Sequence, residues 1–197
     1  MSEAAIKSLP VGSSGKLGVG LWGVLTLIAT EAALFACLLF AYAFTAVQQG
    51  RAWFPAGQPM LALAGPNTLV LLLSSAAVWW GEKGLKAGKP RRLTLGLLVA
   101  IILGAAFVAV QLMEWKEKGS TITSNGYSSF FFTITGFHMA HVVAGLLGLA
   151  AVLGWNLLGY FDARRNTAVA AASLYWHFVD AVWLLVFGAF YLAPYLV

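Results

Sequence analysis

Charged residues are scarce in this sequence, and their scarcity excludes most water-soluble folds. Of the 197 residues, 10% are charged and 60% are hydrophobic, whereas soluble domains carry roughly 25% charged residues. So few charged residues cannot cover the surface of a water-soluble protein of this size. Lipid must therefore cover much of the surface of this chain. The single cysteine, Cys37, allows neither an internal disulfide nor a CxxC motif for metal or redox chemistry. The sequence also lacks a nucleotide-binding loop and a catalytic-triad pattern.

Five long apolar runs lie between the few charged residues. Each approaches or exceeds the ~20 residues that a membrane-spanning helix needs, and none alternates as the strands of a membrane barrel do. We therefore predict an all-α, polytopic membrane helix bundle with five transmembrane helices, formed as a single membrane domain over residues 1–197. The helices are expected at roughly 17–46, 67–84, 93–115, 127–156 and 168–195.

Lysine and arginine are distributed unevenly among the connections between these runs. If the N-terminus is cytoplasmic, three of the 12 cationic residues, Arg51, Lys116 and Lys118, face the other side, and the rest face the cytoplasm. The positive-inside rule therefore predicts an N-in, C-out orientation. The expected location is a bacterial-type inner membrane. The net charge of +5 is then expected to meet anionic lipid headgroups rather than nucleic acid.

Ionisable groups inside the spans are the first candidates for function, because placing them in a bilayer is costly. Glu31 lies near the middle of the first predicted helix, with no Lys or Arg within helical reach. It is either a hydrogen-bonded carboxyl that faces the bundle interior, or a site that handles protons or responds to lipid. The residues alone leave both interpretations open.

Two pairs of polar residues are spaced three apart, so that each pair shares a helix face. They are His138 with His141, and His177 with Asp180. Three histidines on two helices could ligate copper or hold a haem. However, the spacing is not that of an HExxH zinc helix, and no carboxylate-rich cluster completes a site. We therefore expect hydrogen bonds between helices that fix the packing, and no metal.

Other polar and small residues are expected to have structural roles. Gln111 and Glu114 share a face at the outer end of the third predicted helix, near the membrane interface. Asn67 follows Pro66 and is expected to cap the second helix. Close helix approach is expected at the glycines of the first and fourth helices, namely Gly18, Gly20, Gly23, Gly145 and Gly148.

Three segments resemble subunit III of the haem-copper respiratory oxidases. YWHFVDAVWLLVFGAFY, at 175–191, looks like the last helix of that subunit. TGFHMAHVVAG, at 135–145, resembles its GFHGLH stretch, and TEAALFACLLFAYAF, at 30–44, resembles the helix that carries its buried glutamate. The resemblance extends over residues 22–191. It is to the short five-helix form, also found in quinol oxidases, which lacks the first two of seven helices.

The resemblance implies a non-catalytic subunit of a proton-pumping terminal oxidase. Such a subunit binds no haem or copper, which lie in partner subunits; it stabilises the catalytic subunit, supports proton uptake and binds structural phospholipid. The implied partners are subunits I and II and a small subunit IV. By position, Glu31 matches the family's buried, carbodiimide-reactive glutamate. His138, His141, His177 and Asp180 match the family's histidine and aspartate positions in its last two helices. Arg164 and Arg165 match basic residues that meet lipid headgroups.

Several alternatives remain open at this point. Cytochrome c is the expected electron donor, and quinol is the alternative. An accessory protein of nitric oxide reductase would share much of the pattern. A protein of another class, an independent haem-binding quinol enzyme, would use His138 or His141 together with His177.

Overall fold

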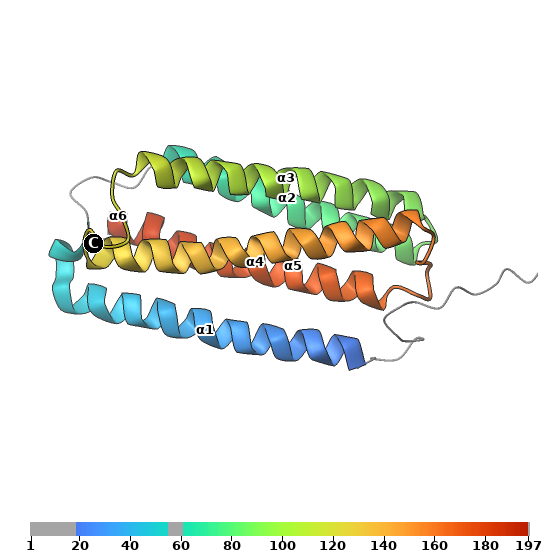
Figure 1. The fold of residues 1–197 in the computed structure, drawn as a ribbon, viewed down its shortest axis with the longest axis horizontal. Helices are drawn as coiled ribbons and strands as arrows, with labels where there is room; N and C mark the ends of the chain where they lie inside the picture. The colour runs from blue at the N-terminus through green and yellow to red at the C-terminus, as the bar shows by residue number, and fades with distance from the viewer. Residues whose placement is uncertain (1–18, 55–60, 197) are drawn as a thin grey trace, which may run out of the picture.

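The computed structural model describes residues 19–54 and 61–196, and these residues form a bundle of long helices (Figure 1). Five of the helices are long and apolar enough to cross a membrane, and the described ranges contain no strand. The prediction of an all-α, polytopic bundle is therefore confirmed. The helices are α1 (Val19–Gln49), α2 (Leu61–Lys86), α3 (Pro90–Glu117), α4 (Gly126–Leu157) and α5 (Thr167–Phe187). A 3-10 turn, η1 (Gly50–Trp53), follows α1; a π-helical turn, η2 (Gly188–Leu192), and α6 (Ala193–Leu196) follow α5.

The start of α2 differs most from the prediction. The helix begins at Leu61, and Pro66 lies inside it. Pro66 removes only one hydrogen bond, to the carbonyl of Ala62, and the helix continues through it. Asn67 is therefore not a cap. Its side chain is buried, and Nδ2 donates to the backbone carbonyl of Phe107 in α3, at 3.3 Å.

Local signals explain two other helix starts. Pro90 is the first residue of α3, a position where its missing N–H has no helical partner to lose. Asn125 caps α4, and its side-chain oxygen accepts a hydrogen bond from the backbone N–H of Ser128 at 2.7 Å.

Helices α2 to α5 form a four-helix bundle, and α1 lies along one edge of it, beside α4 and α5 (Figure 1). Only 6% of the most apolar stretch of α1 is buried, whereas the other four spans are 33% to 39% buried. Among the α1 residues whose side chains are described, Phe35 and Tyr42 are the buried ones. Most of the surface of α1 therefore needs lipid or a partner protein to cover it.

Glycines set the close approaches inside the bundle. A Cβ built on Gly96 would lie 2.5 Å from the carbonyl oxygen of Ala77 and 2.9 Å from the Cα of Gly81, so α2 and α3 meet backbone to backbone. Gly104 and Gly145 both lie against the Trp176 ring, which is fully buried.

The glycine predictions from the sequence were right at one position only. Close approach is found at Gly145, but nothing lies within 4 Å of a Cβ built on Gly20, Gly23 or Gly148. Gly18 lies outside the described residues. The first-helix glycines face open space because α1 is peripheral.

Candidate functional site

Glu31 of α1 meets His141 of α4. The carboxyl oxygen Oε2 lies 2.9 Å from Nε2 of the imidazole. Phe35, one turn along α1, packs edge-on against the His141 ring with centroids 5.1 Å apart. The two side chains are 26% and 14% exposed, respectively. The pair therefore lies at the side of the bundle, where lipid can reach it, rather than in its core.

Both ring nitrogens of His141 have partners. Nδ1 lies 2.6 Å from the carbonyl oxygen of Phe137, and because a carbonyl can only accept, Nδ1 donates this hydrogen bond. Nε2 is thereby left to face the carboxyl of Glu31. His141 thus provides the partner that keeps Glu31 within a membrane span.

His138 shares a helix with His141 but has a different environment. It is 1% exposed, and neither ring nitrogen has a hydrogen-bond partner among the residues that the structure describes. Its ring is tilted against Trp183, with centroids 5.0 Å apart, and meets Phe107 edge-on at 6.0 Å. The expected interhelical hydrogen bond is therefore absent for His138. Aromatic packing against Phe107 and Trp183 holds the ring.

His177 and Asp180 are brought together by a residue of α2. The hydroxyl of Ser75 donates a short hydrogen bond to Oδ2 of Asp180, and its oxygen lies 2.7 Å from Nδ1 of His177. On its other side, Nε2 of His177 lies 3.3 Å from the hydroxyl of Ser173. The two residues that the sequence placed on one face therefore form an interhelical contact through Ser75.

Gln111 and Glu114 form a buried cluster near the C-terminal end of α3. Nε2 of Gln111 donates to Oε2 of Glu114 at 2.9 Å, and the hydroxyl of Tyr191 donates to Oε1 at 2.5 Å. Lys118, beyond the end of α3, lies with its ammonium 3.6 Å above the Phe131 ring. Burial lowers the pKa of Lys118, and the negative charge of Glu114 partly offsets this. The cluster ties the C-terminal end of α3 to η2, the turn that follows α5.

Arg164 and Arg165 lie in the loop between α4 and α5, and Asp162 organises their backbone. Oδ1 of Asp162 accepts hydrogen bonds from the backbone N–H groups of both arginines, each at 2.7 Å. Nε of Arg165 lies 3.8 Å from Oδ2. These N–H groups hold the pKa of Asp162 below its ordinary value of 3.8. The carboxylate thus fixes the turn that carries the two cations.

Asp162→Ala is therefore expected to loosen this turn at neutral pH. Because the folded-state pKa of Asp162 is lowered, its stabilising contribution is fully present above pH 3.8 and is lost as the pH falls through the lowered value. Hydrogen exchange at the Arg164 and Arg165 amides should be faster in Asp162→Ala at neutral pH, and the difference should shrink in acid. Asp162→Asn keeps an acceptor oxygen, so it should lie between the two. Equal exchange in all three proteins would contradict this role.

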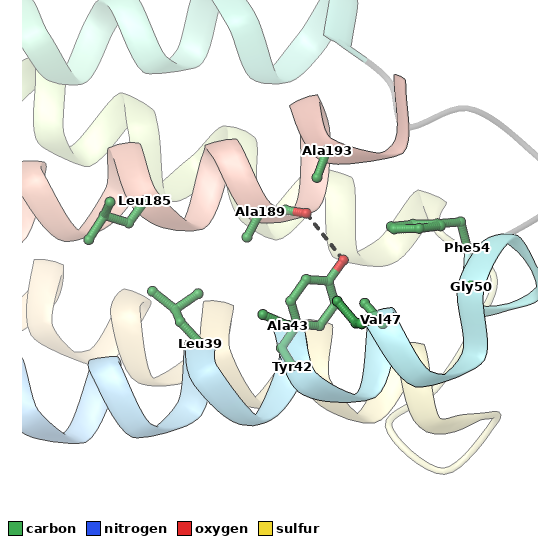
Figure 2. A pocket seen from close by; sticks show the side chains of 10 residues that line it. Leu39, Tyr42, Ala43, Val47, Gly50, Phe54, Leu185, Ala189 and Ala193 are labelled. Carbon is green, nitrogen blue, oxygen red and sulfur yellow. Dashed lines mark hydrogen bonds between the residues drawn. The ribbon is translucent and has the colours of Figure 1, made fainter. Parts of the chain in front are cut away.

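An apolar groove opens between α1 and the C-terminal part of the chain, near the C-terminal end of α1 (Figure 2). Its volume is about 540 Å³. The hydroxyl of Tyr42 donates to the carbonyl oxygen of Ala189 at 3.1 Å, which leaves no free side-chain polar group in the lining. We call it the α1–α5 groove; it is lined by Leu39, Tyr42, Ala43, Ala46, Val47, Gly50, Phe54, Leu185, Ala189 and Ala193. Its size and lining suit a hydrocarbon chain.

Sequence reasoning missed the partners of the ionisable groups. Ser75, Ser173 and Tyr191 were not selected, although two adjacent serines within the apolar run at 69–78 are a visible signal. Within residues 19–54 and 61–196, no group of three or more His, Cys, Asp and Glu side chains is placed to hold a metal ion.

Comparison with known proteins gives consistent matches. The sequence model of the family described as cytochrome c oxidase subunit III matches residues 13–195. Similar curated proteins include cytochrome c oxidase subunit 3 of Tachyglossus aculeatus aculeatus, which is 34% identical over 177 residues, covering 86% of this chain and 68% of the relative. The proteins of the same name from Arabidopsis thaliana and Scyliorhinus canicula are each 35% identical over 177 residues, covering 86% of this chain and 67% and 68% of the relatives.

Proposed function

Because this chain belongs to the cytochrome c oxidase subunit III family, we propose that it is a non-catalytic subunit of a proton-pumping haem-copper oxidase. It stabilises the catalytic subunit, supports proton uptake and binds structural phospholipid. Its partners are subunits I and II and a small subunit IV, in a bacterial-type inner membrane with the N-terminus in the cytoplasm. The electron donor is cytochrome c, the donor in the relatives' name; quinol is the alternative. The haems and copper lie in the partner subunits.

The arrangement of the three histidines supports a non-catalytic role. His141 is held by Glu31, His177 by Ser75, and the ring of His138 lies between Phe107 and Trp183. These contacts are between different helices, so they stabilise the packing of the bundle, as interhelical polar contacts do in membranes.

Removing this chain from the assembled oxidase tests the non-catalytic role. The remaining subunits should reduce oxygen at first and then lose activity during turnover, because the stabilising subunit is missing. Adding the purified chain back before turnover should extend the active lifetime. If the depleted complex retains its haems and yet reduces no oxygen from the start, the chain takes part in catalysis and the proposal is wrong.

The single observation that supports the lipid role is the partly exposed Glu31–His141 pair, which lies beside the exposed apolar side chains of α1. A phospholipid whose phosphate binds Arg164 and Arg165 would lay its chains along α1, past Glu31. Charge-assisted hydrogen bonds from arginine to phosphate are among the strong ones. The α1–α5 groove offers a second site for a hydrocarbon chain near the other end of α1.

Glu31→Ala should leave assembly of the oxidase intact and reduce either the retained phospholipid or the lifetime during turnover. The reason is that the hydrogen-bonded Glu31–His141 pair shapes the surface on which the lipid lies. Thr30→Ala is the matched control, because the Thr30 hydroxyl donates to the carbonyl of Leu27 in its own helix. Lipid content by mass spectrometry and oxygen consumption over time are the readouts. If Glu31→Ala equals Thr30→Ala in both, the lipid role is refuted.

A further inference from the structure

A row of hydrogen-bonding side chains follows the seam between α2 and α5, apart from the Glu31–His141 pair. As residue numbers rise along α5 they fall along α2, since Trp176 donates to Ser74 and Trp183 donates to Thr68, each at 3.0 Å. The two helices are therefore antiparallel. We call the following set the α2–α5 polar row, in order from the lysine-rich end of α2: Glu82, Ser173, His177, Ser75 and Asp180.

The inner half of this row has a defined hydrogen-bond direction. A serine hydroxyl has one hydrogen, and that of Ser75 goes to Oδ2 of Asp180. The contact of 2.7 Å between Ser75 and Nδ1 of His177 must then be donated by the imidazole. In the neutral ring this leaves Nε2 as an acceptor, and it faces the hydroxyl of Ser173 at 3.3 Å.

The outer half of the row connects it to the end of the bundle. Glu82 lies on α2 two turns nearer the lysine-rich end than Ser75, which places this carboxyl beyond the Ser173 end of the row. Glu82 also pairs with Lys86 at 2.6 Å, and its side chain is 16% exposed. The hydroxyl of Ser173 has Nε2 of His177 as its hydrogen-bond partner, and Glu82 is the acid that lies next along the seam toward the end of the bundle.

The inner end of the row is a buried acid. Asp180 is 4% exposed, and its Oδ1 has no hydrogen-bond partner within the described part of the chain. From Ser173 to Asp180 the row follows seven residues of α5, about 10 Å of helix. An acid at each end, with an imidazole between two hydroxyls, is the composition of proton relays in membrane proteins.

We propose that the α2–α5 polar row is a proton relay that carries a proton from the end of the bundle at Glu82 to Asp180. Protonated Glu82 gives its proton to the hydroxyl of Ser173, whose own proton binds Nε2 of His177. The Nδ1 proton of His177 passes to Ser75, whose hydroxyl proton binds Oδ2 of Asp180. The net change is that Glu82 becomes a carboxylate and Asp180 becomes a neutral acid. Rotation of the hydroxyls and tautomer exchange of the ring restore the original direction.

Two other hydrogen bonds between α2 and α5 involve no titratable group, and they serve as a comparison for the α2–α5 polar row. Ser74 and Thr68 join α2 to α5 through tryptophan N–H groups, which do not titrate. Ser74 and Ser75 are adjacent and both bond across to α5, but Ser75 alone of the two lies in the row. They therefore offer a matched pair of substitutions with the same chemistry.

The test measures hydrogen–deuterium exchange of the Asp180 carboxyl in the resting complex, by infrared spectroscopy after transfer into D₂O. The protonated carboxyl band of Asp180 is identified as the one missing in Asp180→Asn. Ser75→Ala is expected to slow its exchange about tenfold or more, equivalent to ~1.4 kcal/mol of barrier, and Ser74→Ala to leave it unchanged. Glu82→Gln, which does not touch Asp180, should also slow it.

Two results would overturn the relay. The first is exchange in Ser75→Ala and Glu82→Gln as fast as in the unmodified complex. The second is the absence of any protonated Asp180 band across the pH range in which the complex is intact. The relay deepens the proposed support of proton uptake, but the measurement needs neither electron donor nor oxygen. Its failure would therefore leave the assignment as an oxidase subunit untouched.

Discussion

Gly96→Ala is expected to force α2 and α3 apart. The new Cβ would lie 2.5 Å from the carbonyl oxygen of Ala77 and 2.9 Å from the Cα of Gly81, and both are backbone atoms that cannot rotate away. Overpacking of this kind costs about 1–3 kcal/mol and occasionally more. Alanine is favoured over glycine within a helix by ~0.5–1 kcal/mol. A net loss of stability, measured by thermal unfolding in mild detergent, would show that the backbone clash outweighs this gain.

Gly148→Ala is the matched control for this substitution. It makes the same chemical change within a helix, but nothing lies within 4 Å of its new Cβ. It should therefore be neutral or slightly stabilising. Equal stability of the two variants would mean that α2 and α3 do not approach as closely as the structure has them.

Trp176→Ala is expected to cost about 3–5 kcal/mol, the typical range for truncating a large buried aromatic side chain. Trp176 is fully buried, its ring lies against Gly104 and Gly145, and its N–H is bonded to Ser74. Truncation opens a cavity among α3, α4 and α5 and leaves the Ser74 hydroxyl without this donor. The expected readout is a large loss of folded chain and of its recovery with the other subunits.

Trp79→Ala provides the comparison at the surface. Trp79 is 52% exposed and its ring lies 3.6 Å from the ammonium of Lys83. Its removal should change stability far less than removal of Trp176. If the two substitutions reduce stability to a similar extent, the Trp176 ring does not hold α3, α4 and α5 together.

The sequence predicted the helices well, because the signal for a membrane span is local. The absence of charge over some twenty residues suffices to find one. The start of α2 was misplaced because Pro66 was taken as a boundary, whereas the helix begins a turn earlier and tolerates it. The glycine contacts were mostly missed, since whether a glycine faces a neighbouring helix depends on the packing and not on its own segment.

The polar candidates illustrate the same limit. The sequence indicated that Glu31, His177 and Asp180 need partners, because unpaired ionisable groups in a bilayer are costly. It did not indicate which partners. His141 is 110 residues from Glu31, and Ser75 is 105 residues from Asp180. His138 shows the opposite case, since it shares the pattern of His141 but is held by aromatic rings.

The exposed surface of α1 is consistent with a chain that is one part of a larger assembly. A span that is only 6% buried is covered in the membrane by lipid, by partner subunits or by both. Together with family membership, this makes recovery of the intact complex the decisive observation.

The most direct test is to purify the tagged chain from its native membrane in mild detergent and to record which polypeptides and haems accompany it. We expect a large haem- and copper-bearing subunit that consumes oxygen, and reduced cytochrome c should be oxidised faster than quinol. Recovery of the chain alone, carrying its own haem, would contradict the proposed function and would make His138, His141 and His177 the active centre.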